Sequence, residues 1–389
     1  MDFTKLTAYL DSLAGTYGIP AVDCKVTRGY ETLYRHGAGY ADPQGARPVA
    51  DTDLYGVYSA TKVVTAVAAL QLIQQGKLSL SDRLDAYLPE FAELFVSRGD
   101  PAGDAPLRSP GGDASPARAQ NPIRVLDLFR MTAGLTYDLG AAALQAYVRD
   151  NRHGGTMRGA MAAIARMPLI CEPGTRWVYS LAHDVLGGLV ETVSGERYGA
   201  YLQRHLFEPL EIRDMTLTPD AAQRARLSAQ YQADAATGRI VPWEEPSPYR
   251  LTEAYESGGA GLYCTVNAYS LFAQALANGG VGATGNRILT SESIDLMRRN
   301  WLDERMLRDF AATGKTGYGY GLGVRTLMDA SAARSPVGEF GWDGAAGAYV
   351  LIDPENRLSL FVAEHVLGFE ENYRTIHPRI RDLVYEALG

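Results

Sequence analysis

The residues with the clearest chemical potential are Ser59 and Lys62, which form an S-x-x-K motif at the start of an apolar stretch. This spacing places two side chains on one face of a helix, within reach of each other. The first turn of a helix also offers free backbone N–H groups and a positive dipole, which suit developing negative charge. A lysine in apolar surroundings can accept the serine proton. The pair therefore predicts a serine nucleophile with a lysine base.

An S-x-x-K motif by itself is also compatible with a helix-capping serine followed by a surface lysine. The context favours the catalytic interpretation. This is the single S-x-x-K of the chain, and residues 60–76 are apolar on nearly every side of the helix that they predict. A helix with this pattern is usually buried, so Lys62 would be an unusual surface residue on it.

Two further segments are candidates for the same site. Tyr179 stands in a predicted loop before a helical stretch at residues 182–194, and a loop tyrosine can act as a general base or acid if cations lower its pKa. Residues 341–345 lie at a predicted strand end, where glycine would let a substrate approach the backbone closely. Taken alone, Tyr179 could be an ordinary packed aromatic residue, and residues 341–345 a simple turn.

The order of several segments resembles the class C β-lactamase superfamily of penicillin-recognising serine hydrolases, most closely the family VIII carboxylesterases. Residues 128–135 are similar to the "L-L-x-H-T-S-G-L" segment of that superfamily, with Met131 and Ala133 in place of histidine and serine. Residues 257–265 resemble "G-G-L-x-S-T", with Cys264 in place of serine. The similarity follows the segment order of the superfamily and extends from about residue 18 to 365. The matching segments are residues 58–62, 128–135, 173–180, 186–187 and 257–265.

The resemblance implies a role for each candidate. Ser59 would be acylated, while Lys62 and Tyr179 would share its activation and protonate the leaving group. The backbone N–H groups of Ser59 and Ala345 would form the oxyanion hole, a device that typically contributes a few kcal/mol to transition-state stabilisation. The third motif of the superfamily would be residues 342–344, which makes Trp342 and Gly344 substrate-binding residues, together with Leu181 near Tyr179.

A literal K-T-G at residues 315–317 competes for the third motif. It stands directly before residues 318–323, a Y-G-Y-G-L-G run that precedes the third motif in the superfamily. We therefore interpret Lys315 as a loop residue and expect its replacement to change turnover little. Arg176 and His183 are close to Tyr179 in sequence, and their roles stay open.

Two departures from the superfamily pattern bear on the substrate. Leu181 replaces the asparagine of the Y-x-N motif, which binds the amide of a β-lactam or peptide, and Trp342 replaces a basic residue that helps to hold a substrate carboxylate. Both changes favour a carboxylesterase acting on small or short-acyl esters, by hydrolysis or by acyl transfer. The alternatives are a β-lactamase, a D-amino-acid peptidase, or a non-catalytic binding or sensor protein on the same scaffold.

Composition narrows the partners. The chain has 389 residues and a net charge of −8, which disfavours nucleic-acid binding. Its 3 cysteines show no disulfide framework or zinc spacing, so no metal or cofactor is expected. The amino-terminal residues show no signal-peptide pattern, and the apolar-rich stretch at residues 63–73 is too short to span a bilayer. We expect a cytoplasmic protein without membrane contact; the oligomeric state stays open.

The hydrophobic pattern predicts an α/β (α+β sandwich) fold. Strand patterns at residues 21–27 and 30–36 are matched by strands near the other end, and a helix closes the chain at about residues 370–388. This arrangement predicts an antiparallel sheet with flanking helices, formed by residues 1–78 and 209–389, and an inserted, mostly helical domain at residues 79–208. The active site would lie between them. The carboxyl-terminal strands are expected at residues 318–326, 338–342, 348–352 and 358–363, and an exposed loop at residues 99–121.

Overall fold

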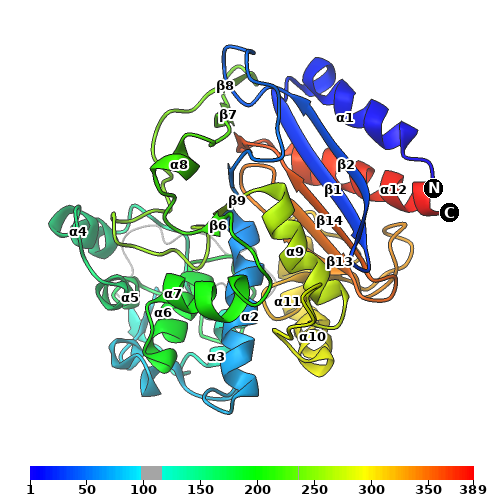
Figure 1. The fold of residues 1–389 in the computed structure, drawn as a ribbon. Helices are drawn as coiled ribbons and strands as arrows, with labels where there is room; N and C mark the ends of the chain where they lie inside the picture. Colours follow the sequence, from blue (N-terminus) through cyan, green and yellow to red (C-terminus); the bar gives the residue numbers. More distant parts are fainter. Residues whose placement is uncertain (98–115, 235) are drawn as a thin grey trace.

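The computed structural model describes residues 1–97, 116–234 and 236–389. Its centre is a seven-stranded antiparallel sheet of order β10-β11-β12-β13-β14-β1-β2 (Figure 1). Strand β1 pairs with β14, so the two ends of the chain meet in one sheet, as the sequence predicts. The strands are β1 (Ala21–Arg28), β2 (Glu31–Gly39), β10 (Tyr318–Tyr320), β11 (Arg325–Leu327), β12 (Phe340–Asp343), β13 (Tyr349–Asp353) and β14 (Leu358–Ala363).

Helices cover both faces of this sheet. Strand β14 is buried along its whole length, and its side chains alternate between two hydrophobic clusters because successive residues of a strand point to opposite faces. One cluster includes residues of α1 (Thr4–Tyr17) and α12 (His377–Leu388), and the other includes residues of α9 (Val266–Ala277). Figure 1 shows α1 and α12 on one side of the sheet and α9 on the other.

The second part of the fold is mostly helical and centres on α2 (Thr61–Gln74). All residues of α2 except the last two are buried, because the helix is apolar on every side and lies inside the main core. It packs against α6. The neighbouring helices are α3 (Val125–Phe129), α4 (Ala142–Asp150), α5 (Met157–Ala165), α6 (Ala182–Ser194) and α7 (Tyr198–Leu202).

Short elements complete the described chain. Two small three-stranded sheets have the orders β3-β9-β6 and β15-β7-β8. The elements are β3 (Tyr55–Gly56), β6 (Met215–Thr216), β7 (Tyr231–Ala233), β8 (Ile240–Pro242), β9 (Tyr263–Cys264), β15 (Val366–Leu367), α8 (Ala221–Arg224), α10 (Ser291–Arg298) and α11 (Glu304–Ala311).

The expected strand at residues 318–326 is two strands in the structure. The chain turns between β10 and β11, where the Gly321 N–H donates to the Val324 carbonyl at 2.7 Å. Gly323 has a φ of +81°, a conformation that favours glycine, so the glycine-rich sequence breaks the strand. The predicted loop at residues 99–121 lies largely outside the described residues; within its described part, β5 (Ala117–Arg118) pairs with β4 (Phe95–Val96).

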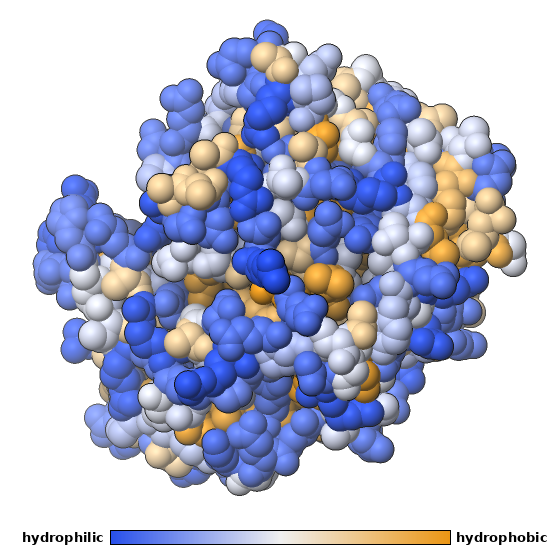
Figure 2. Space-filling view, viewed as in Figure 1, coloured by the Kyte–Doolittle hydropathy of each residue, from blue (hydrophilic) through white to orange (hydrophobic). Residues whose placement is uncertain are grey.

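The face drawn in Figure 2 is mostly hydrophilic, and its hydrophobic residues gather in small groups. In the described part of the chain, no helix combines the length and hydropathy needed to cross a membrane. Across those same residues, no three or more His, Cys, Asp or Glu side chains cluster where they could hold a metal ion.

Candidate active site

Ser59 lies in a single turn of 3-10 helix, Tyr58–Ala60, that leads directly into α2. The preceding residue, Tyr58, has a φ of +45° although it is bulky and not glycine. Such a conformation is uncommon for this kind of residue and tends to occur at functional sites. The turn leaves Ser59 only 9% exposed, at the wall of a cavity.

Lys62 is fully buried one turn further along α2. Its Nζ lies 3.0 Å from Ser59 Oγ, 2.8 Å from the Tyr137 hydroxyl and 2.8 Å from the Gly259 carbonyl oxygen. Burial lowers the pKa of Lys62 to about 7, although the negative charge of Asp184 raises it in part. A neutral amine has two N–H groups and one lone pair, so it can donate to Gly259 and Tyr137 while its lone pair faces Ser59.

Tyr179 approaches the same serine from the loop before α6. The Trp342 indole Nε1 donates to its hydroxyl at 3.0 Å, and Lys62 Nζ lies 4.7 Å from its ring centroid. Burial raises the pKa of Tyr179, although hydrogen bonds with Ser59 and Trp342 oppose this. The lowered pKa considered from the sequence is therefore wrong: Tyr179 is a protonated phenol, suited to giving a proton.

The cavity beside these residues measures about 390 Å³, and half of the residues that line it are aromatic. This composition suits the binding of an apolar group with a few polar contacts. The lining residues are Ser59, Tyr137, Trp177, Tyr179, Tyr249, Thr313, Lys315, Trp342, Asp343, Gly344, Ala345 and Tyr373.

The end of β12 brings the predicted third motif to this cavity. A side chain at Gly344 would put its Cβ 2.3 Å from the Val57 carbonyl oxygen, so only glycine lets the strand end pack against the turn before Ser59. The Tyr373 hydroxyl donates to the Gly344 carbonyl at 3.0 Å and fixes this segment. Gly344 and Ala345 thus share a cavity wall with Ser59.

Three residues singled out near Tyr179 lie away from the cavity walls. Leu181 was expected to contact substrate, but its side chain is buried in the main core and is not among the described residues that line the cavity. His183 is buried with Nε2 3.2 Å from the Phe129 carbonyl oxygen, and burial lowers its pKa to about 3. Arg176 is buried in an ion pair with Asp309, with atoms 2.6 Å apart. Both residues are occupied by structural contacts.

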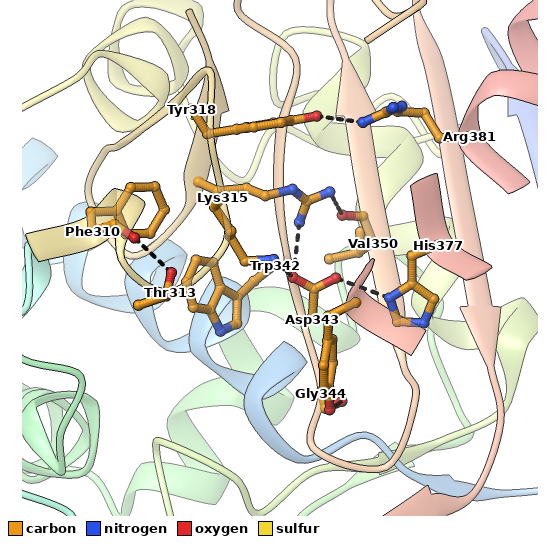
Figure 3. Close-up of polar contacts among 12 residues, drawn as sticks. Phe310, Thr313, Lys315, Tyr318, Trp342, Asp343, Gly344, Val350, His377 and Arg381 are labelled. Carbon is orange, nitrogen blue, oxygen red and sulfur yellow. Dashed lines mark hydrogen bonds and ion pairs between the residues drawn. The ribbon is translucent and has the colours of Figure 1, made fainter. Parts of the chain in front are cut away.

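Lys315 is placed differently from the expectation. It lies in a loop between α11 and β10, as predicted, but this loop forms part of the cavity wall. Its Nζ lies 2.6 Å from Asp343 Oδ2, and His377 Nδ1 lies 3.1 Å from Asp343 Oδ1. Figure 3 shows the Asp343 carboxylate between Lys315 and His377.

The Asp343 carboxylate is surrounded by cations although it is buried. Burial alone raises its pKa, but the charges of Lys315 and Arg325 and the His377 hydrogen bond outweigh this and hold the pKa of Asp343 well below its usual range. Asp343 therefore stays a carboxylate and holds the Lys315 ammonium in an ion pair at the cavity wall.

Sequence reasoning missed three residues around Lys62, namely Tyr137, Asp184 and Gly259. Each is a near neighbour of a segment that had been singled out: Tyr137 follows residues 128–135, Asp184 follows His183, and Gly259 belongs to residues 257–265. Their proximity to those segments was the available signal. The contacts of Tyr137 and Gly259 with Lys62, and the effect of the Asp184 charge on it, depend on the tertiary fold.

The chain is similar to known proteins over nearly its whole length. Esterase EstB of Burkholderia gladioli is 28% identical over 384 residues, covering 92% of this chain and 89% of EstB. The structure of EstCE1, a hydrolase with promiscuous acyltransferase activity, superposes with a TM-score of 0.80 at 25% identity over 98% of each chain. The simvastatin synthase LovD of Aspergillus terreus shares the fold, with a TM-score of 0.80 at 21% identity over 100% of this chain and 99% of LovD.

The family assignment rests on nearly the whole sequence. The family model described as Beta-lactamase matches residues 6–385. Fold, motif order and relatives thus agree, and the chain belongs to the beta-lactamase family.

Proposed function

We propose that this protein is a serine hydrolase that forms an acyl-enzyme on Ser59 and acts on small or short-acyl esters. The observation that carries the proposal is the 3.0 Å approach of the buried Lys62 amine to Ser59 Oγ at the wall of an aromatic cavity. The similarity to an esterase and to a hydrolase with acyltransferase activity supports the same class of reaction.

The first half of the reaction follows from the contacts of Lys62. Its lone pair takes the Ser59 hydroxyl proton while Ser59 Oγ bonds to the ester carbonyl carbon. The carbonyl oxygen becomes an oxyanion, for which the N–H groups of Ser59 and Ala345 are the proposed donors. The bond from this carbon to the alcohol oxygen then breaks, and the Tyr179 phenol gives its proton to the departing alkoxide.

The second half restores the enzyme. The proton that Lys62 took from Ser59 passes to the Tyr179 phenolate, whose ring centroid lies 4.7 Å from the amine, and both groups regain their starting protonation states. A water molecule then attacks the acyl group, gives up a proton to the Lys62 and Tyr179 pair, and releases the acid as Ser59 regains its hydrogen. An alcohol that replaces water would complete an acyl transfer, an outcome in line with the described activity of EstCE1.

The cavity walls favour an ester over a β-lactam. A β-lactam or peptide brings a carboxylate and an amide into the site, and each buried polar group without a partner costs about 1–3 kcal/mol. Leu181 supplies no amide to the cavity, and the Lys315 ammonium is already paired with Asp343. A simple ester carries neither group and gains apolar contact with the aromatic walls.

One observation favours a β-lactamase or D-amino-acid peptidase as the second candidate. The Lys315 ammonium lines the cavity, and it could attract a substrate carboxylate if Asp343 gave it up. A non-catalytic binding protein is the less favoured alternative, since such a protein would not need a buried lysine beside a serine.

The test is kcat/KM for p-nitrophenyl butyrate beside a chromogenic cephalosporin under the same conditions. We expect the ester to be favoured by about two to four orders of magnitude, from two unpaired polar groups on the β-lactam. A higher value for the cephalosporin would replace the esterase proposal with the β-lactamase one. Turnover of neither compound, with Ser59 unreactive to a fluorophosphonate, would indicate a binding protein.

A further inference from the structure

Asp184 is a buried carboxylate whose charge acts on Lys62, and it is not among the described residues that line the cavity. Asp184 stands in the first turn of α6 and is 2% exposed. Its Oδ1 accepts hydrogen bonds from the Tyr255 hydroxyl at 2.8 Å and the Ser257 hydroxyl at 2.6 Å. The backbone N–H of Gly259 also donates to this carboxylate. The reaction proposed above gives Asp184 no task, although burying a carboxylate is costly.

The backbone of Gly259 lies between Asp184 and Lys62. Its N–H faces Asp184, and its carbonyl oxygen accepts from Lys62 Nζ at 2.8 Å. A Cβ at this position would lie 2.3 Å from Asp184 Oδ2 and 3.0 Å from the Tyr137 hydroxyl. The backbone of Gly259 is therefore fitted closely between the Asp184 carboxylate and the Lys62 site.

We propose that Asp184 is a positioning residue for Lys62: it holds the Gly259 carbonyl against the amine, and its buried charge stabilises the ammonium that forms when Lys62 takes the Ser59 proton. The inference rests on the proposed function, in which Lys62 is the base. It assigns the carboxylate a role in the rate and pH dependence of Ser59 activation rather than in the fold alone.

The groups that face both partners are consistent with this role. Lys62 faces the hydroxyl groups of Ser59 and Tyr137, the Tyr179 ring and the neutral His183. Among the described residues, Asp184 is the carboxylate whose charge acts on Lys62, and that charge raises the Lys62 pKa that burial lowers. Burial also raises the pKa of Asp184 itself, while its hydrogen bonds and the charge of Lys62 favour the carboxylate. Asp184 itself accepts from the hydroxyl groups of Tyr255 and Ser257, and its charge raises the pKa values of Tyr137, Tyr179, Tyr198 and Tyr249.

The experiment measures the rate at which a fluorophosphonate labels Ser59 as a function of pH, because this readout needs no known substrate. In the wild type the rate should rise with a midpoint near the Lys62 pKa of about 7. Asp184→Asn removes the charge that favours the ammonium, so the midpoint should move to lower pH by about one unit. The plateau rate should fall about tenfold, since the amine becomes a weaker base.

Glu256→Gln is the matched control. Glu256 is a buried carboxylate next to Ser257, and it bonds to Arg197 and to the Gly199 N–H, each at 2.7 Å. The substitution makes the same change of charge beside the same loop, and the midpoint should stay in place. Tyr255→Phe is a milder second variant: the carboxylate loses one donor and takes up a proton at higher pH, so the midpoint should shift in the same direction by less.

The outcomes separate the two proposals. A slower rate with an unmoved midpoint in Asp184→Asn, or equal shifts in Asp184→Asn and Glu256→Gln, would overturn the role of Asp184 while leaving Ser59 as the nucleophile. If Asp184→Asn does not fold, an unmoved midpoint in Tyr255→Phe overturns it. A wild-type protein labelled somewhere other than Ser59 would overturn the proposed function, and this inference with it.

Discussion

Two lysines lie at the same cavity in different electrostatic surroundings. Lys62 is fully buried and contacts three uncharged oxygen atoms, on Ser59, Tyr137 and Gly259. Lys315 lies on the cavity wall, its side chain 19% exposed, and contacts the carboxylate of Asp343 at 2.6 Å. Both belong to motifs that sequence reasoning singled out, S-x-x-K and K-T-G.

The difference shows that the charge of the nearest partner decides what a lysine can do. Burial among uncharged groups lowers the pKa of Lys62 to about 7, so the amine can accept a proton near neutral pH. A lysine held in an ion pair has no lone pair to offer, and Lys315 can act only as a charge or as part of the wall. The following substitutions test this contrast, from the largest expected effect to the smallest.

Replacing the nucleophile or its base should have the largest effect. Ser59→Ala and Lys62→Ala should each lower kcat/KM for an ester by about three orders of magnitude or more, because members of a nucleophile–base unit fail together. The double variant should be little worse than either single one. Ester turnover that survives in Ser59→Ala would rule out this serine as the nucleophile.

The two tyrosines beside Lys62 should differ. Tyr179→Phe removes the proposed proton donor to the leaving group and should lower kcat by about two to three orders of magnitude. Tyr137→Phe removes one hydrogen-bond partner of the Lys62 amine, so we expect a loss of about tenfold, near the energy of a single hydrogen bond. Steady-state kinetics on one ester should show a larger loss of kcat in Tyr179→Phe than in Tyr137→Phe. The reverse result would indicate that Tyr137, and not Tyr179, gives the proton to the leaving group.

Lys315→Ala should have the smallest effect on turnover and a clear effect on stability. We expect kcat/KM for a neutral ester within a few-fold of wild type. The free energy of unfolding should fall by about 1–3 kcal/mol at neutral pH, because a buried carboxylate loses the Lys315 cation while the Arg325 cation and the His377 hydrogen bond remain.

The stability difference should also depend on pH. The native pKa of Asp343 is depressed, so its stabilisation is present above the unfolded-state pKa of about 3.9 and is lost as the pH falls below it. Denaturant titrations of wild type and Lys315→Ala should therefore converge in acid. A large loss of ester turnover in a folded Lys315→Ala variant would show that the ammonium takes part in the reaction.

Local patterns carried most of what the sequence could predict. The alternation in β14, the apolar helix α2 and the S-x-x-K spacing depend on neighbouring residues, and the structure has them where expected. The ion pair of Lys315 with Asp343 and the contact of Lys62 with Gly259 join residues 28 and 197 positions apart. Leu181 was misplaced because the chain enters α6 there and turns this side chain into the core.

The most direct test of the central claim is to map the site of fluorophosphonate labelling by peptide mass spectrometry in wild type, Ser59→Ala and Lys62→Ala at several pH values. We predict one label per chain, on Ser59, at a rate that rises with a midpoint near pH 7, the pKa of Lys62. Ser59→Ala should not be labelled, and Lys62→Ala should react far more slowly. A label on another residue, or an unchanged rate without Lys62, would contradict the account.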